Sequence, residues 1–196
     1  MKNFVEELGI TGHLTISKKD KETGEEEVLF DDHNIIVSGM GVSLSYLFTG
    51  SGSNSIVDYQ IDRYQLGVSG GTELEVSGTF DLSSPLAFAD YGPEANSYIK
   101  ESTQIVNGSD TTGVSFVLIP ASKVTRINDR SVRYTLVVDD EMANDTTYPL
   151  NEVGLFMKNP TGSVGQDKSI LVAYRTFSDI DKTSDFSLIF RWTLNL

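Results

Sequence analysis

The last eleven residues of the chain, numbered 186–196, are FSLIFRWTLNL, and their pattern indicates the fold class. Every second position is apolar, namely Phe186, Leu188, Phe190, Trp192, Leu194 and Leu196. Among the intervening residues only Ile189 is apolar. A period of two predicts a β-strand with one face against a core and the other toward solvent. Because the alternation continues to residue 196, we expect this terminus to be held in a sheet.

Similar strand patterns occur at several earlier places in the chain. The expected strands cover residues 12–16, 27–30, 65–68, 98–106, 114–118, 132–138 and 150–156. Residues 170–174 form a continuous apolar run, which predicts a strand that is covered on both faces. The first two strands flank a charged stretch around Thr23 and Gly24, and this arrangement is typical of a hairpin with a solvated tip.

One segment, residues 35–48, has helical spacing instead. Its apolar residues at helical intervals are Met40, Leu44, Leu47 and Phe48. Asp32 or Asn34 is expected to cap the helix, because short polar side chains satisfy the free N–H groups of its first turn. Gly39 and Gly41 weaken a helix intrinsically, so we expect them to make room for close packing against a sheet.

These patterns predict a mainly β protein. The expected architecture is a two-sheet, jelly-roll-like β-sandwich with one short helix in the N-terminal half. The length of the chain is typical of a single domain, which we place over residues 1–196. The signal is weakest over residues 51–131, which we expect to be rich in loops.

Composition excludes several classes of function. The chain has 15 Lys and Arg, 28 Asp and Glu, two His and no Cys, with a net charge of -13. This balance argues against nucleic-acid binding and against docking on anionic lipid, because both require clustered basic residues. The lack of Cys excludes disulfides and thiolate chemistry. No run approaches the ~20 apolar residues of a membrane span, and no secretory signal is visible, so we expect synthesis in a cytoplasm.

Acidic residues are plentiful, but their arrangement does not predict a catalytic or metal site. They gather at Asp31 and Asp32, over residues 139–145, and at Asp179 and Asp181. Paired carboxylates hydrolyse glycosides only at a defined separation in a cleft, and solvated turns are their commoner setting. Residues 139–145 also lack the ligand spacing of an EF-hand calcium loop.

Glycine-rich and histidine-containing segments are similarly uninformative about catalysis. Residues 38–43 and 67–72 contain paired glycines but match neither a dinucleotide-binding nor a P-loop pattern. A Ser-His-Asp triad would need His13 or His33, and His33 is expected to have a capping or local hydrogen-bonding role. The sequence therefore predicts no catalytic, cofactor-binding or metal-binding residues, no cofactor, and no enzymatic activity.

Glu152 is a polar residue whose position predicts burial. It shares parity with Leu150 and Phe156, which places it on an inward face of its strand. A buried, unpaired carboxylate is costly, so we expect Arg175 or Arg191 as its partner.

Three blocks of the sequence, taken in order, carry a family resemblance. The first is FDDHNIIV (residues 30–37), followed by a glycine-punctuated helix that ends in YLFTG (residues 46–50). The second comprises YTL (134–136), EMAN (141–144) and NEVGLF (151–156), and the third comprises LVAYRTF (171–177), DIDK (179–182) and FSLIFRW (186–192). In this order the blocks resemble virion structural proteins of tailed bacteriophages, from the neck, tail and baseplate region. The resemblance covers residues 28–50 and 132–196, a little under half of the chain.

This resemblance implies a non-enzymatic structural subunit of a tailed-phage particle. Such a subunit is made in the host cytoplasm, is located in the virion, and contacts other virion proteins and copies of itself in rings or trimers. Neither sequence-specific nucleic-acid binding nor membrane binding is implied. The sequence does not distinguish neck, collar, tail adaptor, baseplate and fibre attachment. The alternative function is a carbohydrate-binding β-sandwich module, which the eight Tyr residues and the loop-rich region of residues 51–131 support.

Overall fold

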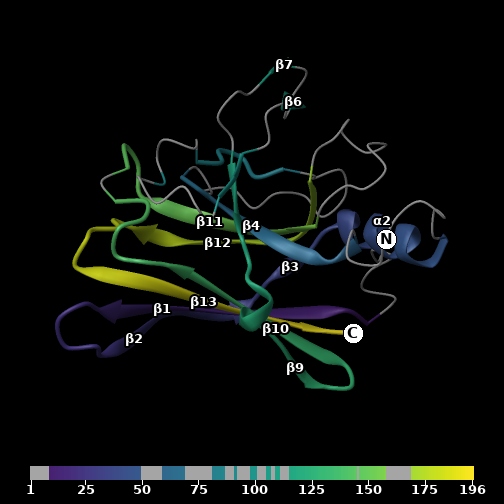
Figure 1. Cartoon of the computed structure of the whole chain (residues 1–196), viewed down its shortest axis with the longest axis horizontal. Helices are drawn as coiled ribbons and strands as arrows, with labels where there is room; N and C mark the ends of the chain where they lie inside the picture. Colours follow the sequence, from purple (N-terminus) through teal and green to yellow (C-terminus); the bar gives the residue numbers. More distant parts are fainter. Residues whose placement is uncertain are drawn as a thin grey trace.

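A computed structural model describes most of the chain, and it shows two stacked antiparallel sheets (Figure 1). The described residues are 9–49, 59–68, 81–86, 91, 98–100, 105–106, 109–110, 115–144, 146–157 and 169–196. One sheet has the strand order β2-β1-β13-β10-β9 and the other has the order β3-β12-β11-β4-β8-β5. The prediction of a mainly β, two-sheet sandwich with a helix in the N-terminal half is therefore confirmed.

The five-stranded sheet contains the first and last long strands of the chain as neighbours. Its strands are β1 (Thr11–Asp20), β2 (Glu26–His33), β9 (Val124–Asn128), β10 (Ser131–Val138) and β13 (Phe186–Asn195). Strands β1 and β13 pair over their full length, from Thr11 opposite Asn195 to Asp20 opposite Phe186. The N–H of Leu196 donates to the carbonyl of Arg130 at 2.7 Å, so this terminus is held in the sheet as predicted.

The six-stranded sheet covers the other side of the core. Its strands are β3 (Ile35–Ile36), β4 (Ile61–Gly67), β5 (Tyr98–Lys100), β8 (Ser115–Leu118), β11 (Leu150–Met157) and β12 (Ile170–Ile180). The remaining elements are helix α2 (Ser38–Thr49), the 3-10 turn η4 (Ala121–Lys123), and the small pair β6 (Ile105–Val106) and β7 (Ser109–Asp110). Strands β4, β8 and β9 lie within residues 51–131, which thus contain more strand than the weak sequence signal predicted.

Burial follows the alternation of the C-terminal strand. Along β13 every second residue from Phe186 to Leu194 is buried between the sheets, whereas Leu196 is 56% exposed. Residues 170–174 are buried on both faces, as predicted. On the outer face of the second sheet they contribute to a smaller cluster, which comprises Val37, Leu82, Phe116, Phe156, Leu171 and Tyr174.

Helix α2 was predicted correctly, but its start and its packing face were not. The short strand β3 comes first, so Asp32 belongs to β2 and Asn34 lies before β3, and neither residue caps the helix. The helix packs through its first half: a Cβ atom on Gly39 would lie 1.9 Å from the carbonyl oxygen of Leu171 on β12. This contact confirms the close-packing role of Gly39. It also explains why Phe48, at the far end of the helix, remains 81% exposed.

The predicted β1–β2 hairpin is confirmed with its charged tip. The carboxylate of Asp20 accepts hydrogen bonds from the N–H groups of Glu22 at 3.0 Å and Thr23 at 2.8 Å. Gly24 has a φ of 73°, a left-handed conformation that glycine adopts without strain.

Candidate functional site

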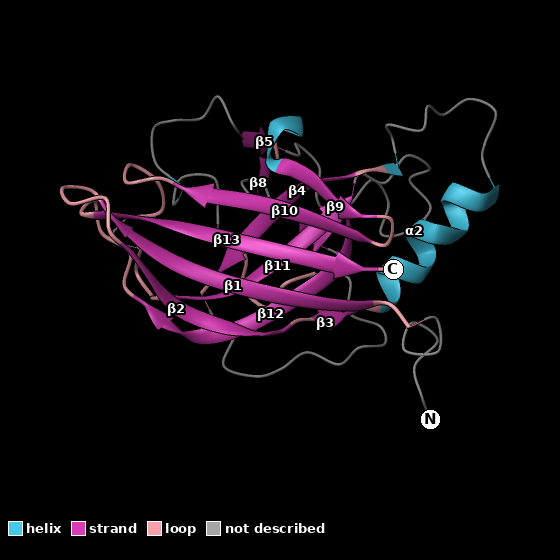
Figure 2. Ribbon diagram, turned by 90° about the horizontal axis from the view of Figure 1, so that it is seen from below, coloured by secondary structure: helices cyan, strands magenta, loops and turns pink. Residues whose placement is uncertain are grey.

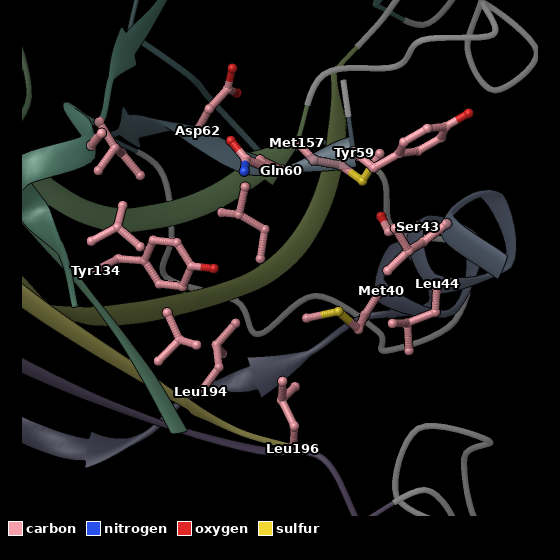
Figure 3. Close-up of a pocket in the computed structure, with 16 residues that line it drawn as sticks. Met40, Ser43, Leu44, Tyr59, Gln60, Asp62, Tyr134, Met157, Leu194 and Leu196 are labelled. Carbon is pink, nitrogen blue, oxygen red and sulfur yellow. The ribbon is translucent and has the colours of Figure 1, made fainter. Parts of the chain in front are cut away.

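A pocket of about 510 Å³ lies at one end of the sandwich, between α2 and the ends of both sheets (Figure 3). Its size is typical of ligand-binding pockets, which span about 300–1,000 Å³. The lining is mainly aliphatic and includes Met40 and Leu44 of α2, Ile61 of β4, Met157 of β11 and Leu194 of β13. The pocket therefore forms where elements from distant parts of the sequence converge.

Tyr134 of β10 supplies the main polar group of this pocket. Its side chain is 8% exposed and its hydroxyl points into the pocket (Figure 3). Burial raises the pKa of Tyr134 to about 12, and within the described residues its hydroxyl has no hydrogen-bond partner. Trp192, its cross-strand neighbour on β13, is fully buried, and no described group accepts a hydrogen bond from its indole Nε1. Two donors thus lie without acceptors on one apolar surface.

Two of the other polar residues around the pocket, Ser43 and Asp62, are already engaged. The Ser43 hydroxyl donates to the carbonyl of Gly39 at 2.7 Å, within the helix. Asp62 forms an ion pair with Arg63, whose guanidinium also donates to the Ser169 hydroxyl at 3.1 Å. The pocket therefore offers apolar contact area together with the Tyr134 hydroxyl and the Gln60 side chain, and its described lining holds no nucleophile with an adjacent base.

Beside the pocket, α2 ends in an exposed apolar tip, which we define as Leu47 and Phe48. Leu47 lines the pocket and is 42% exposed, and Phe48 is 81% exposed. Leu196, which lines the same pocket, is also exposed. Exposed apolar side chains that gather in one place mark contact sites, whereas single ones are ordinary. This end of the molecule is the surface most suited to contact another molecule.

Glu152 of β11 is fully buried, as its parity predicted, but the expected arginine partner is wrong. Its carboxylate accepts hydrogen bonds from the backbone N–H groups of Ser84 at 2.8 Å and Ser83 at 3.2 Å. Arg175 instead pairs with Asp32 and Arg191 pairs with Glu26. Burial raises the pKa of Glu152, and the two backbone donors oppose that shift. This carboxylate attaches the 81–86 segment to the second sheet.

The acidic and histidine candidates from the sequence do not assemble into a site. Asp140 pairs with Lys21, and Asp179 accepts a hydrogen bond from Asn151. The rings of His13 and His33 meet edge to face at 5.7 Å. The His33 ring nitrogen Nδ1 lies 3.3 Å from the Gly12 carbonyl of the neighbouring strand, a contact across strands instead of the expected capping or local hydrogen bond. Across the described ranges, no three His, Cys, Asp or Glu side chains are grouped to hold a metal ion.

The pocket was not predicted from the sequence. The alternation that placed Tyr134 on an inward face treats it like any core residue. One feature of the sequence could have indicated the pocket: position 134 is a tyrosine on an inward face, and a buried tyrosine hydroxyl usually has a hydrogen-bond partner.

Among the helices that the structure describes, none is long and apolar enough to cross a membrane.

Comparison with known proteins adds no relative: no family model, no curated protein and no solved structure matches this chain.

Proposed function

We propose that this protein is a non-enzymatic structural subunit of a tailed-phage particle, present in several copies and in contact with other virion proteins. The observation that carries the proposal is the apolar tip of α2. A phenylalanine that is 81% exposed at the end of an ordered helix gains stability only when another surface covers it.

The spatial arrangement of the family-like blocks supports the same proposal. Residues 28–50 and 132–196 are far apart in sequence, yet β3 pairs with β12 through Ile36 opposite Ala173 and Ile35 opposite Tyr174. Gly39 of α2 packs on Leu171 of the same strand. The blocks therefore form one packed unit, which is the expected result if they derive from a common subunit architecture.

The alternative, a carbohydrate-binding module, has less in its favour. Sugar platforms need exposed aromatic rings that lie together, and Trp192 is fully buried in the core. In the described part of the chain the most exposed aromatic residues are Phe48 and Tyr148. Phe48 ends α2, whereas Tyr148 lies in the β10–β11 connection at the opposite end of the sandwich (Figure 2). A glycan array would test this alternative directly.

Mass spectrometry of purified virions tests the leading proposal. We expect the protein in intact particles at several copies each, and its absence from particles would refute the proposal.

Substitutions then test the apolar tip. Phe48→Ser and Leu47→Ser should lower the number of copies incorporated when the variant competes with wild-type protein during infection. Leu118→Ser on β8 is a matched control, because Leu118 is 40% exposed, close to the 42% of Leu47, and lies on another element. Equal incorporation of all variants would remove the tip as the contact surface.

A further inference from the structure

The five-stranded sheet has two open edges, and they carry opposite charges. Strand β2 forms one edge and β9 the other, with β1, β13 and β10 between them (Figure 2). Apart from half-buried Phe30 and Val124, all residues of both strands are exposed. An edge strand presents unpaired N–H and C=O groups that another chain can pair with.

The acidic edge is β2 with the turn before it. Residues 22–33 contain six acidic residues and no Lys or Arg: Glu22, Glu25, Glu26, Glu27, Asp31 and Asp32. Including Lys18, Lys19, Asp20 and Lys21 from β1 and the turn, residues 18–33 hold seven acidic and three basic residues, a net charge of 3 − 7 = −4. Two arginines from other strands also pair with this edge, Arg175 with Asp32 and Arg191 with Glu26, and with them the net charge is −4 + 2 = −2. The edge therefore stays negative after its neighbouring basic residues are counted.

The basic edge is β9 with the residues around it. Residues 123–133 contain Lys123, Arg126, Arg130 and Arg133 against Asp129, a net charge of 4 − 1 = +3. These four are over a quarter of the 15 basic residues of a chain whose net charge is -13. Such a concentration on one edge is not expected from a uniformly acidic surface.

Both edges also expose apolar side chains between their charges. Val28 and Leu29 of β2 are 59% and 40% exposed, and Ile127 of β9 is 45% exposed. Glu27 next to Val28 has no ion-pair or hydrogen-bond partner among the described residues. Arg126 next to Ile127 donates to the Asn128 carbonyl at 3.2 Å and forms an ion pair with Asp129, whose side chain is 96% exposed. Exposed ion pairs contribute little to stability, so the charges of Glu27 and Arg126 remain available to bind another molecule.

We propose that β9 of one copy adds to β2 of the next copy, so that the five-stranded sheet continues from subunit to subunit. This inference rests on the proposed function, in which several copies act together. Contacts between two β2 edges would bring like charges together, and so would contacts between two β9 edges. Charge therefore selects a head-to-tail contact, which forms a ring when the rotation closes and a filament when it does not.

Charge reversal tests this contact by sedimentation velocity at low salt. Wild-type protein should sediment as an oligomer that dissociates as salt increases, because the attraction is screened. Glu27→Lys alone and Arg126→Glu alone should each weaken the contact, so that the oligomer dissociates at a lower salt concentration than the wild-type oligomer does. An equimolar mixture of the two variants should recover the oligomer, because each junction then joins opposite charges. Glu141→Lys is the matched control: it changes the charge as Glu27→Lys does, but at an exposed position of the β10–β11 connection, on neither edge strand.

A carbodiimide cross-link tests the position of the contact, since this reagent joins a lysine to a carboxylate that touches it. Lys123 directly precedes β9, which is four inter-strand spacings, about 19 Å, from the β2 carboxylates of its own chain. A bond between Lys123 and Glu25, Glu26 or Glu27 therefore reports two copies in contact. We expect this bond in the oligomer and its loss when salt disperses the oligomer.

Several outcomes would overturn the inference. They are a wild-type chain that is monomeric at millimolar concentration, an oligomer that both reversals leave intact, or an oligomer without the Lys123 cross-link. Detection of the protein in virions at several copies would in each case leave the proposed function standing. Absence from virions with the cross-link present would instead refute the proposed function alone.

Discussion

Gly67 and Glu152 form a contact whose energy can be measured as a coupling. A Cβ atom on Gly67 would lie 2.3 Å from Glu152 Oε1 and 2.6 Å from its Cγ, whereas ordinary contacts begin at 3.4 Å. The carboxylate cannot move aside easily, because it is fully buried and held by the N–H groups of Ser83 and Ser84. Overpacking of this kind costs about 1–3 kcal/mol. Alanine regains about 0.5–1 kcal/mol over glycine in a strand, so Gly67→Ala should destabilise by about 0.5–2 kcal/mol.

The sign of this effect should reverse when Glu152 is removed. Glu152→Ala leaves the N–H groups of Ser83 and Ser84 without their acceptor but also removes the desolvation penalty of the carboxylate. We expect a net loss of about 2 kcal/mol. In that background Gly67→Ala meets no carboxylate, so it should stabilise by about 0.5–1 kcal/mol. The coupling between the two positions is therefore about 1–3 kcal/mol.

Urea unfolding of the wild type, the two single variants and the double variant measures this coupling. Trp192 is the only tryptophan and is buried, so its fluorescence reports unfolding. Free energies that add within about 0.5 kcal/mol would refute the steric reasoning, because additive effects are those of independent sites. A Gly67→Ala variant as stable as wild type would refute it as well.

Three further predictions concern single groups. Tyr134→Phe should change the free energy of unfolding by less than about 0.5 kcal/mol, because the hydroxyl has no partner among the described residues. The same substitution should remove a titration with a pKa of about 12 from the ultraviolet titration curve of the wild type. Because the pKa of Glu152 is raised, the native state keeps the proton of this carboxyl group to a higher pH than the unfolded chain does. The free energy of unfolding should therefore fall as the pH rises from 4.5 toward the raised pKa. Glu152→Gln should flatten this pH dependence, which urea unfolding at several pH values measures. The Arg191 guanidinium lowers the pKa of Glu26, so the dependence of stability on pH has the opposite sign for this group. The stability that Glu26 contributes is present above pH 4.5 and is lost as the pH falls through the lowered pKa. Glu26→Gln should abolish this loss in acid-unfolding curves.

Alternation predicted most of the long strands and the buried face of β13, although it missed β3 and β9, and the reason for its success is geometric. Side chains of a strand point to alternate faces, so the pattern of residues 186–194 requires no knowledge of their neighbours. Predicting the order of strands in a sheet does require knowledge of the neighbouring strands, since any strand can pair with several others. Helix α2 shows a related limit: Ile35 and Ile36 fit a helical spacing as well as a strand, and their pairing with β12 decides for the strand.

The partner of Glu152 shows why parts of the site could not be predicted. Parity correctly placed this carboxylate in the interior, and a search by residue type then indicated an arginine. Its actual donors are the backbone N–H groups of Ser83 and Ser84, a kind of group that nearly every residue carries. Sequence patterns do not show which backbone group will lie near a buried charge from 68 residues away. The pocket around Tyr134 follows the same logic, because it depends on how distant elements converge.

The distribution of charge is where strand order adds most to the sequence. Counted along the chain, the net charge of -13 indicates an acidic, solvated surface, and the acidic residues 22–27 look like part of it. The strand order places residues 22–33 and 123–133 on the two open edges of one sheet. If both edges were acidic, like charges would protect them against pairing with other copies. Because one edge is basic, contacts between the basic edge of one copy and the acidic edge of another are attractive. Contacts between two basic edges remain repulsive. The opposite charges at the two edges therefore favour head-to-tail association over symmetric pairing, a preference that the net charge alone does not reveal.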